Sequence, residues 1–237
     1  MAGMKTIGMI GGMSWESTVP YYRLVNEAVA RRLGGLHSAK VLLASVDFAE
    51  VEAMQRGGDW AAAARLLADT ARSLERAGAD FLVVCTNTMH KVADEIEGAV
   101  GIPLLHIADA TAAEVKARGL SKVGLLGTRF TMEQDFYKAR LRGRHGIEAL
   151  VPAEADRAIV HRVIYDELCL GKVLDPSRGE YRRIIRGLVE QGAQGVVLAC
   201  TEIPMLVGAA DSPVPVFDTT ALHARTAAEW ALDGAAP

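Results

Sequence analysis

The sequence predicts an α/β fold made of two similar units, and three observations lead to that prediction. Short apolar runs alternate with amphipathic helical stretches, each apolar run is continuous, and the two halves of the chain repeat the same landmarks in the same order. Continuous apolar strands that alternate with helices are typical of parallel sheets whose two faces are both covered. We therefore expect two pseudo-symmetric domains, each a parallel sheet flanked by helices.

The apolar runs and the helical periodicity place the elements along the chain. Strands are predicted at residues 5–10, 39–46, 80–85, 102–107, 122–127, 195–200 and 214–217. Between them, apolar residues recur with the helical period most clearly at 19–33, 59–78 and 181–192.

The composition excludes several classes of protein. A formal net charge of -3 lacks the basic excess that nucleic-acid binding needs. No apolar run approaches the roughly 18 residues of a membrane span, and the N-terminus lacks the apolar segment and cleavage site of a signal peptide. Three cysteines without a C-x-x-C pair fit a reducing cytoplasm, and their spacing argues against a structural zinc site. We expect a cytoplasmic protein that binds neither nucleic acid nor membrane.

The internal repeat sets the domain organisation. Its landmarks pair Gly8 with Gly124, Gly78 with Gly192, and Pro103 with Pro215, at nearly constant spacing. We expect residues 1–103 with 215–237 to form the first α/β domain and residues 104–214 to form the second. Ligands of such sheets bind beyond the carboxyl ends of the strands, so an active site in the interdomain cleft is expected.

The same repeat separates two adjacent candidates in the stretch "CTNTMH". Counted from the paired glycines, Thr86 falls opposite Cys200, whereas Cys85 falls opposite Ala199. Successive side chains of a strand point to opposite faces, so a shift of one residue turns a side chain away from the site. Thr86 and Cys200 are therefore the predicted pair, and Cys85 is expected to point elsewhere.

Helix starts are expected directly after four of these strands. Ser14 or Ser17 can cap the first helix, Thr131 and Gln134 have the spacing of a capping box, and Pro204 suits a first helical turn. Residues 89–97 predict a helix after "CTNT". Four helix N-termini would form an anion site suited to an amino acid or a small dicarboxylate.

The environment of each remaining candidate is also predicted. Cys200 near such an N-terminus should have a lowered thiol pKa. Cys169 is expected on a helix, packed in the hydrophobic core. Glu202 is expected to meet a substrate ammonium group or to cap its own helix, and His90 to lend a hydrogen bond behind the site or simply to pack. The glycines of "GMIGGM" do not fit a dinucleotide-binding pattern.

Four motifs together resemble the aspartate/glutamate racemase family, within the group that includes hydantoin racemases, maleate isomerases and arylmalonate decarboxylases. They are "KTIGMIGGMSWEST" at 5–18, "CTNTMH" at 85–90, "GLLGTRFT" at 124–131 and "ACTEIP" at 199–204. The resemblance implies two pseudo-symmetric α/β domains, no cofactor, a homodimer, and two cysteines that flank the substrate Cα in the interdomain cleft. It places the second cysteine at Cys200, and Thr86 stands where the first would be.

The predicted function is therefore cofactor-independent racemisation of an amino acid of the aspartate/glutamate type, with Cys200 as thiolate base and Thr86 on the opposite face. Alternatives are a related dicarboxylate isomerase or decarboxylase, similar to maleate isomerase, and a catalytically impaired amino-acid-binding protein. No metal ligands are expected. The predicted substrate-binding residues are Met13, Ser14, Asn87, Thr88, Thr128, Arg129, Thr131, Thr201 and Glu202.

Overall fold

The computed structural model describes residues 3–233 and divides the chain into two compact units. Unit 1 comprises Met1–His106 with His223–Pro237, and unit 2 comprises Ile107–Leu222. The predicted boundaries, before 104 and before 215, differ from this division. In each unit, the fourth strand pairs with the third strand of the same sheet. The chain passes to the other unit only after that fourth strand.

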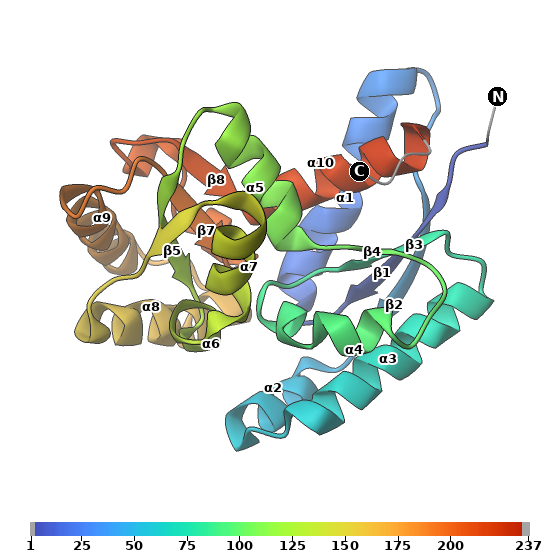
Figure 1. Cartoon of the computed structure of the whole chain (residues 1–237), viewed down its shortest axis with the longest axis horizontal. Coiled ribbons are helices and arrows are strands. Elements are labelled where there is room, and N and C mark those ends of the chain that lie inside the picture. The colour runs from blue at the N-terminus through green and yellow to red at the C-terminus, as the bar shows by residue number, and fades with distance from the viewer. Residues whose placement is uncertain (1–2, 234–237) are drawn as a thin grey trace. The chain divides into compact units, whose positions relative to one another are not determined.

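Unit 1 holds a parallel sheet of four strands in the order β2-β1-β3-β4 (Figure 1). The strands are β1 (Thr6–Gly11), β2 (Lys40–Ser45), β3 (Phe81–Val84) and β4 (Leu104–Leu105). The helices are α1 (Trp15–Leu33), α2 (Phe48–Gly57), α3 (Trp60–Arg76), α4 (Ala93–Glu97) and the greater part of α10 (Thr219–Asp233).

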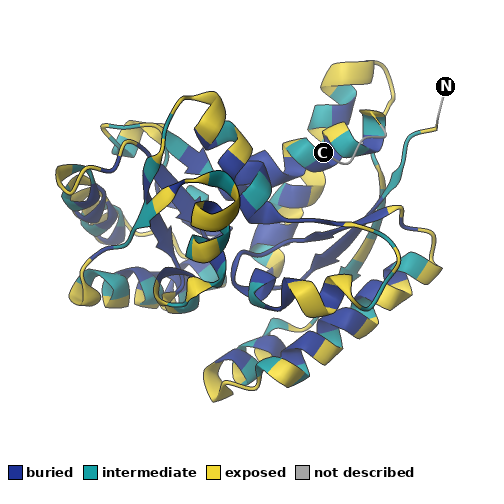
Figure 2. Ribbon diagram, in the orientation of Figure 1, coloured by how far each residue is buried: buried dark blue, intermediate teal, exposed yellow. Residues whose placement is uncertain are grey.

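Alternation along β1 divides the core of unit 1 between the two faces of its sheet. Ile7 and Met9 pack with α1 and α10, whereas Ile10 packs with α3 and α4. The strands β1 and β3 are buried throughout most of their length, which Figure 2 shows as dark blue arrows. This burial on both faces explains why their sequences are continuously apolar.

Unit 2 repeats this architecture with the strand order β6-β5-β7-β8, again parallel. Its strands are β5 (Lys122–Gly127), β6 (Glu148–Leu150), β7 (Val196–Ala199) and β8 (Val216–Asp218). The core residues show α8 (Glu154–Asp166) and α9 (Asp175–Glu190) on one face of the sheet. On the other face lie α5 (Ile107–Ala117) and α7 (Asp135–His145), and a short α6 (Arg129–Glu133) follows β5. The predicted α/β class and paired parallel sheets are confirmed.

The glycines that revealed the repeat have the same structural task in both units. A Cβ atom on Gly8 would lie 2.8 Å from the Cβ of Ala79, and one on Gly124 would lie 2.9 Å from Leu188 Cδ1. Gly78 and Gly192 both have φ of 97°, a conformation that glycine adopts at little cost. Close contacts of the first strand, with Ala79 and β3 in unit 1 and with α9 in unit 2, therefore fix one pair of positions, and a left-handed turn before the third strand fixes the other.

Some elements differ from the sequence-based expectation. The strand β6 was not predicted, because its residues are polar or half-buried at the edge of the sheet. The predicted helix at 89–97 is split into a 3₁₀ helix, η1 (Thr88–Val92), and α4. Among residues 3–233, no helix combines the length and apolar character needed to cross a membrane.

Candidate functional site

The predicted residues of unit 1 lie at the carboxyl ends of two neighbouring strands. Ile10 of β1 pairs with Val84 of β3, so the segments that follow them leave the sheet at the same edge. Met13, Ser14, Thr86, Asn87 and Thr88 are all buried there. The structure thus gathers all five of the residues predicted in this unit.

The loop after β1 is held by α1. The Thr18 hydroxyl accepts a hydrogen bond from the Gly12 amide at 2.9 Å and donates one to the Ser14 carbonyl at 2.9 Å. Ser14 occupies the N-cap position of α1, although its side chain makes no capping hydrogen bond. The Ser17 hydroxyl lies inside the helix and also donates to the Ser14 carbonyl. The prediction that Ser14 or Ser17 caps this helix is therefore met by position only.

Cys85 and Thr86 have different surroundings despite being adjacent. Cys85 is fully buried in the apolar cluster that holds Ile7, Met9 and Val83, and this burial raises the pKa of its thiol far above the ordinary value. Ala199 lies in the equivalent cluster of unit 2. These positions agree with the register that pairs Cys85 with Ala199, and they leave Thr86 as the candidate.

In unit 2, the residues after β5 form the start of α6. Thr128 is the N-cap, and its hydroxyl accepts a hydrogen bond from the Thr131 amide at 3.3 Å. The predicted capping box of Thr131 and Gln134 is therefore wrong, because the helix begins three residues earlier and Gln134 is already extended. Arg129 is exposed, and its guanidinium lies over the Phe130 ring.

Cys200 follows β7, and its thiol has a specific partner. The Sγ atom donates to Oε2 of Glu202 at 3.0 Å, and the Thr201 hydroxyl donates to the same oxygen at 3.0 Å. All three residues are buried. Glu202 stands at the N-cap of the 3₁₀ helix η3 (Ile203–Met205) but makes no capping hydrogen bond. Its carboxylate is directed to the two preceding side chains instead.

The expected lowering of the Cys200 pKa is wrong. Burial raises the pKa of this thiol well above its ordinary value, and the negative charge of Glu202 adds to the effect. The helix that was expected to oppose this is the single turn η3. A short helix has little macrodipole, so desolvation and the neighbouring carboxylate decide the protonation state. The resting form of Cys200 is a thiol whose proton is directed at a carboxylate.

Helix length also bears on the anion site that was predicted from four helix N-termini, because most of these helices are short. The helix α1 has 19 residues, but η1 and α6 have 5 each and η3 has 3. The dipoles of the three short helices would therefore contribute little to such a site.

Cys169 lies nearer to Cys200 than expected. It belongs to the 3₁₀ helix η2 (Leu168–Leu170) rather than to an α-helix, and it is only partly buried. It packs against the core cluster that contains Cys200, and burial followed by the charge of Glu202 raises its pKa.

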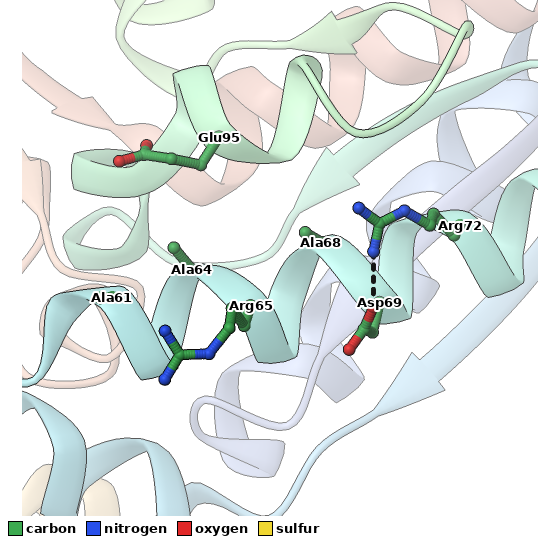
Figure 3. A pocket seen from close by; sticks show the side chains of 7 residues that line it. All are labelled: Ala61, Ala64, Arg65, Ala68, Asp69, Arg72 and Glu95. Atoms are coloured by element: carbon green, nitrogen blue, oxygen red, sulfur yellow. Dashed lines mark hydrogen bonds and ion pairs between the residues drawn. The ribbon is translucent and has the colours of Figure 1, made fainter.

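A surface pocket of unit 1 is lined by none of these residues. It has a volume of about 470 Å³ between α3 and α4, and Figure 3 shows the alanine, arginine and acidic side chains around it. Arg72 pairs with Asp69 at 2.5 Å. The lining residues are Ala61, Ala64, Arg65, Ala68, Asp69, Arg72 and Glu95, and none was predicted to act in the site. Within the described part of the chain, no group of three or more His, Cys, Asp or Glu side chains could hold a metal ion.

Comparisons with known proteins agree with the motifs. The family model described as Asp/Glu/Hydantoin racemase matches residues 10–227. A proposed Asp/Glu racemase from Yersinia pestis, known from its crystal structure, is 61% identical, with a TM-score of 0.90 over 97% of this chain and 100% of that one. An aspartate racemase homologue from Pyrococcus horikoshii OT3 is 35% identical, with a TM-score of 0.81 over 96% and 99% of the two chains. The broad specificity amino-acid racemase RacX of Bacillus subtilis is 25% identical over 166 residues, which are 68% of this chain and 69% of RacX.

Proposed function

Because this chain belongs to the Asp/Glu/hydantoin racemase family, we propose that it racemises a free amino acid at Cα without a cofactor. Aspartate and glutamate are the proposed substrates, in keeping with the names of the relatives from Yersinia pestis and Pyrococcus horikoshii. The observation that carries the proposal is the buried thiol of Cys200, which donates its hydrogen bond to Glu202.

Cys200 acts as the base on one face of Cα. Glu202 accepts the thiol proton and later releases it to solvent, and the resulting thiolate removes the α-proton of the substrate. The Cα–H bond breaks as an S–H bond forms, and the electron pair passes into an enediolate of the substrate carboxylate. The Thr201 hydroxyl, which donates to the same Glu202 oxygen, helps to hold that carboxylate in place.

Thr86 serves the opposite face in this proposal. Its hydroxyl, or a water molecule bound to it, donates a proton to the enediolate at Cα and regains one from solvent. The internal repeat supports this role, since it pairs Thr86 with Cys200. A threonine hydroxyl is a weak base, so removal of the α-proton from the second face should be the slower chemical step.

The remaining residues bind and stabilise the substrate. Hydrogen-bond donors placed where the enediolate charge develops usually give the largest electrostatic contribution in such sites. Thr88, Thr128 and Thr201 supply hydroxyl groups, and the exposed guanidinium of Arg129 is proposed to pair with a substrate carboxylate. The other proposed substrate contacts are Met13, Ser14, Asn87, Thr131 and Glu202.

We propose that the protein works as a homodimer through an apolar patch of unit 1. Trp15, Val19 and Tyr22 form one stripe of α1 and are exposed. Leu43 on β2, an edge strand of the sheet, is exposed as well. With Ser45 and Thr18 they line a groove of about 370 Å³. An isologous contact needs one self-complementary surface, and an exposed apolar edge strand is prone to pairing.

Charge along α1 supports a second copy as the occupant of this patch. Glu16 and Arg23 lie toward opposite ends of the stripe, so an antiparallel copy would place each acid near the partner's base. Sedimentation of the wild type and of Val19→Glu tests this. A dimer that the substitution dissociates supports the proposal, and a monomeric wild type at high concentration contradicts it.

The compartment follows from the chemistry. The three cysteines are free thiols, and catalysis by a thiol requires that it stay reduced. We therefore propose a cytoplasmic location, which measurement of the protein in fractionated cells would check.

The direct test of the proposed base compares two cysteine variants in D₂O. Cys200→Ser should abolish deuterium incorporation at Cα of aspartate and glutamate, whereas Cys85→Ser should retain it. Wild-type exchange in Cys200→Ser would show that another group is the base. A wild type that exchanges no amino acid but isomerises or decarboxylates a dicarboxylate would replace racemisation by the related chemistry, and binding without reaction would indicate a binding protein.

A further inference from the structure

Three buried histidines gather in unit 1 beside the Thr86 turn. His90 belongs to η1, His106 follows β4, and His223 lies on α10. The ring centroids of His90 and His106 are 4.4 Å apart, and those of His90 and His223 are 5.9 Å apart. Each residue is at most 5% exposed. The proposed mechanism uses none of them, so their shared burial next to Thr86 needs an explanation.

The contacts of His223 fix its tautomer. Its Nε2–H donates to the Leu105 carbonyl at 2.9 Å, so Nδ1 of the neutral ring accepts from the Tyr21 hydroxyl at 2.9 Å. Burial lowers the pKa of His223 to about 4. The His223 ring is therefore neutral at neutral pH, both of its nitrogens are hydrogen-bonded, and it packs on one side of this cluster.

His90 is hydrogen-bonded directly to Thr86. Its Nδ1–H donates to the Thr86 carbonyl at 2.7 Å, and the Thr86 amide donates to the Val84 carbonyl at 2.8 Å. The amide and the carbonyl of Thr86 are thus both hydrogen-bonded, the amide to the end of β3 and the carbonyl to an imidazole. The packed rings of His106 and His223 restrict how far the His90 ring can turn.

We infer that His90 is a positioning residue for the second face of the reaction, which holds the Thr86 backbone through its Nδ1–H so that the Thr86 hydroxyl stays aimed at Cα. The inference rests on the proposed function. In this role His90 transfers no proton and only fixes the position of Thr86. Misplacement of a reacting group by about 1 Å is enough to cost a large factor in rate.

Two amide variants separate geometry from proton transfer. The side-chain amide that His90→Asn introduces reaches the position of Nδ1, whereas the longer amide of His90→Gln reaches the position of Nε2. We expect His90→Asn to keep inversion within about threefold of wild type, and His90→Gln to lose it about tenfold or more, which is the effect of one lost hydrogen bond. Deuterium exchange on the Cys200 face should stay near wild type in both, which also shows that both variants fold.

The outcomes distinguish the inference from the proposed function. Equal loss of inversion in both variants, with exchange retained, would mean that the imidazole itself carries a proton, and full activity in both would mean that His90 is only packing; either overturns the inference. A wild type without any exchange contradicts the proposed function, and the role of His90 with it. Independently of activity, ¹⁵N spectra of the histidines should show His90 protonated at Nδ1, and protonation at Nε2 alone would overturn the assignment.

Discussion

The thiol of Cys200 donates a hydrogen bond to Glu202, 3.0 Å away and two residues further along the chain. The two side chains are buried together, and the carboxylate is one of the causes that raise the thiol pKa. A thiol held in this way is protected from deprotonation at rest, but its proton already has an acceptor. The pair thus resembles a nucleophile with its activating base more than an isolated thiolate.

Replacement of the carboxylate should separate reactivity from catalysis. In Glu202→Gln, burial still raises the Cys200 pKa, but the negative charge that adds to it is lost, so the thiolate fraction at a given pH increases. We expect faster alkylation of Cys200 by iodoacetamide at pH 8. At the same time we expect racemisation to be slower by about a hundredfold, because the carboxylate that accepts the thiol proton is missing. Peptide mass spectrometry and a chiral assay measure the two rates. If both rates fall together, Glu202 supports folding of the site rather than proton transfer.

The second face should respond to the residue at position 86. Thr86→Val keeps the shape but removes the hydroxyl, so we expect inversion to fall at least about tenfold while exchange by Cys200 persists. Thr86→Cys supplies a better base and should raise kcat for the slower direction. In every variant kcat/KM must be equal for the two enantiomers, since their equilibrium constant is one. Unchanged inversion in Thr86→Val would remove Thr86 from the mechanism.

The repeated glycines give a prediction about stability. A methyl group on Gly124 would meet Leu188 at 2.9 Å, so Gly124→Ala should destabilise the fold by about 1–3 kcal/mol. Gly187 lies on α9 beside that leucine but has open space around it, and Gly187→Ala should stabilise the helix by about 0.5–1 kcal/mol. Urea unfolding measures both changes in the free energy of unfolding. Equal effects of the two substitutions would contradict the packing argument.

Acid should destabilise unit 1 through His223. The pKa of this ring is about 4 in the folded protein because of burial, and 6.5 is the ordinary value expected when the chain unfolds. The unfolded state then binds the proton more readily, so stability that is complete above pH 6.5 is lost as the pH falls toward 4. The loss amounts to about 3 kcal/mol. Melting temperatures between pH 7 and pH 4.5 should fall less steeply in His223→Gln, and an identical slope would contradict this assignment.

The sequence indicated much of the fold because the repeat has a local physical cause. Gly8 and Gly124 allow close packing, and Gly78 and Gly192 share a positive φ, so these positions are visible without a structure. The edge strand β6 was missed, since its polar residues are not buried on both faces.

The candidate site was predictable only in part. Strand ends and the repeat indicated Thr86 and Cys200, but the pKa of Cys200 depends on burial and on the rotamer of Glu202, neither of which the sequence contains. The cluster of histidines depends on tertiary folding, because His223 is far along the chain from His90.

We propose that Cys200 serves one face of Cα and that Thr86 serves the other. Proton NMR in D₂O on separate samples of L- and D-aspartate and L- and D-glutamate, with a chiral assay of each sample, tests it most directly. We expect loss of the Cα–H signal together with inversion, and equal kcat/KM from either enantiomer. Exchange without inversion would leave Cys200 working alone, and the absence of both would contradict the assignment as an amino-acid racemase.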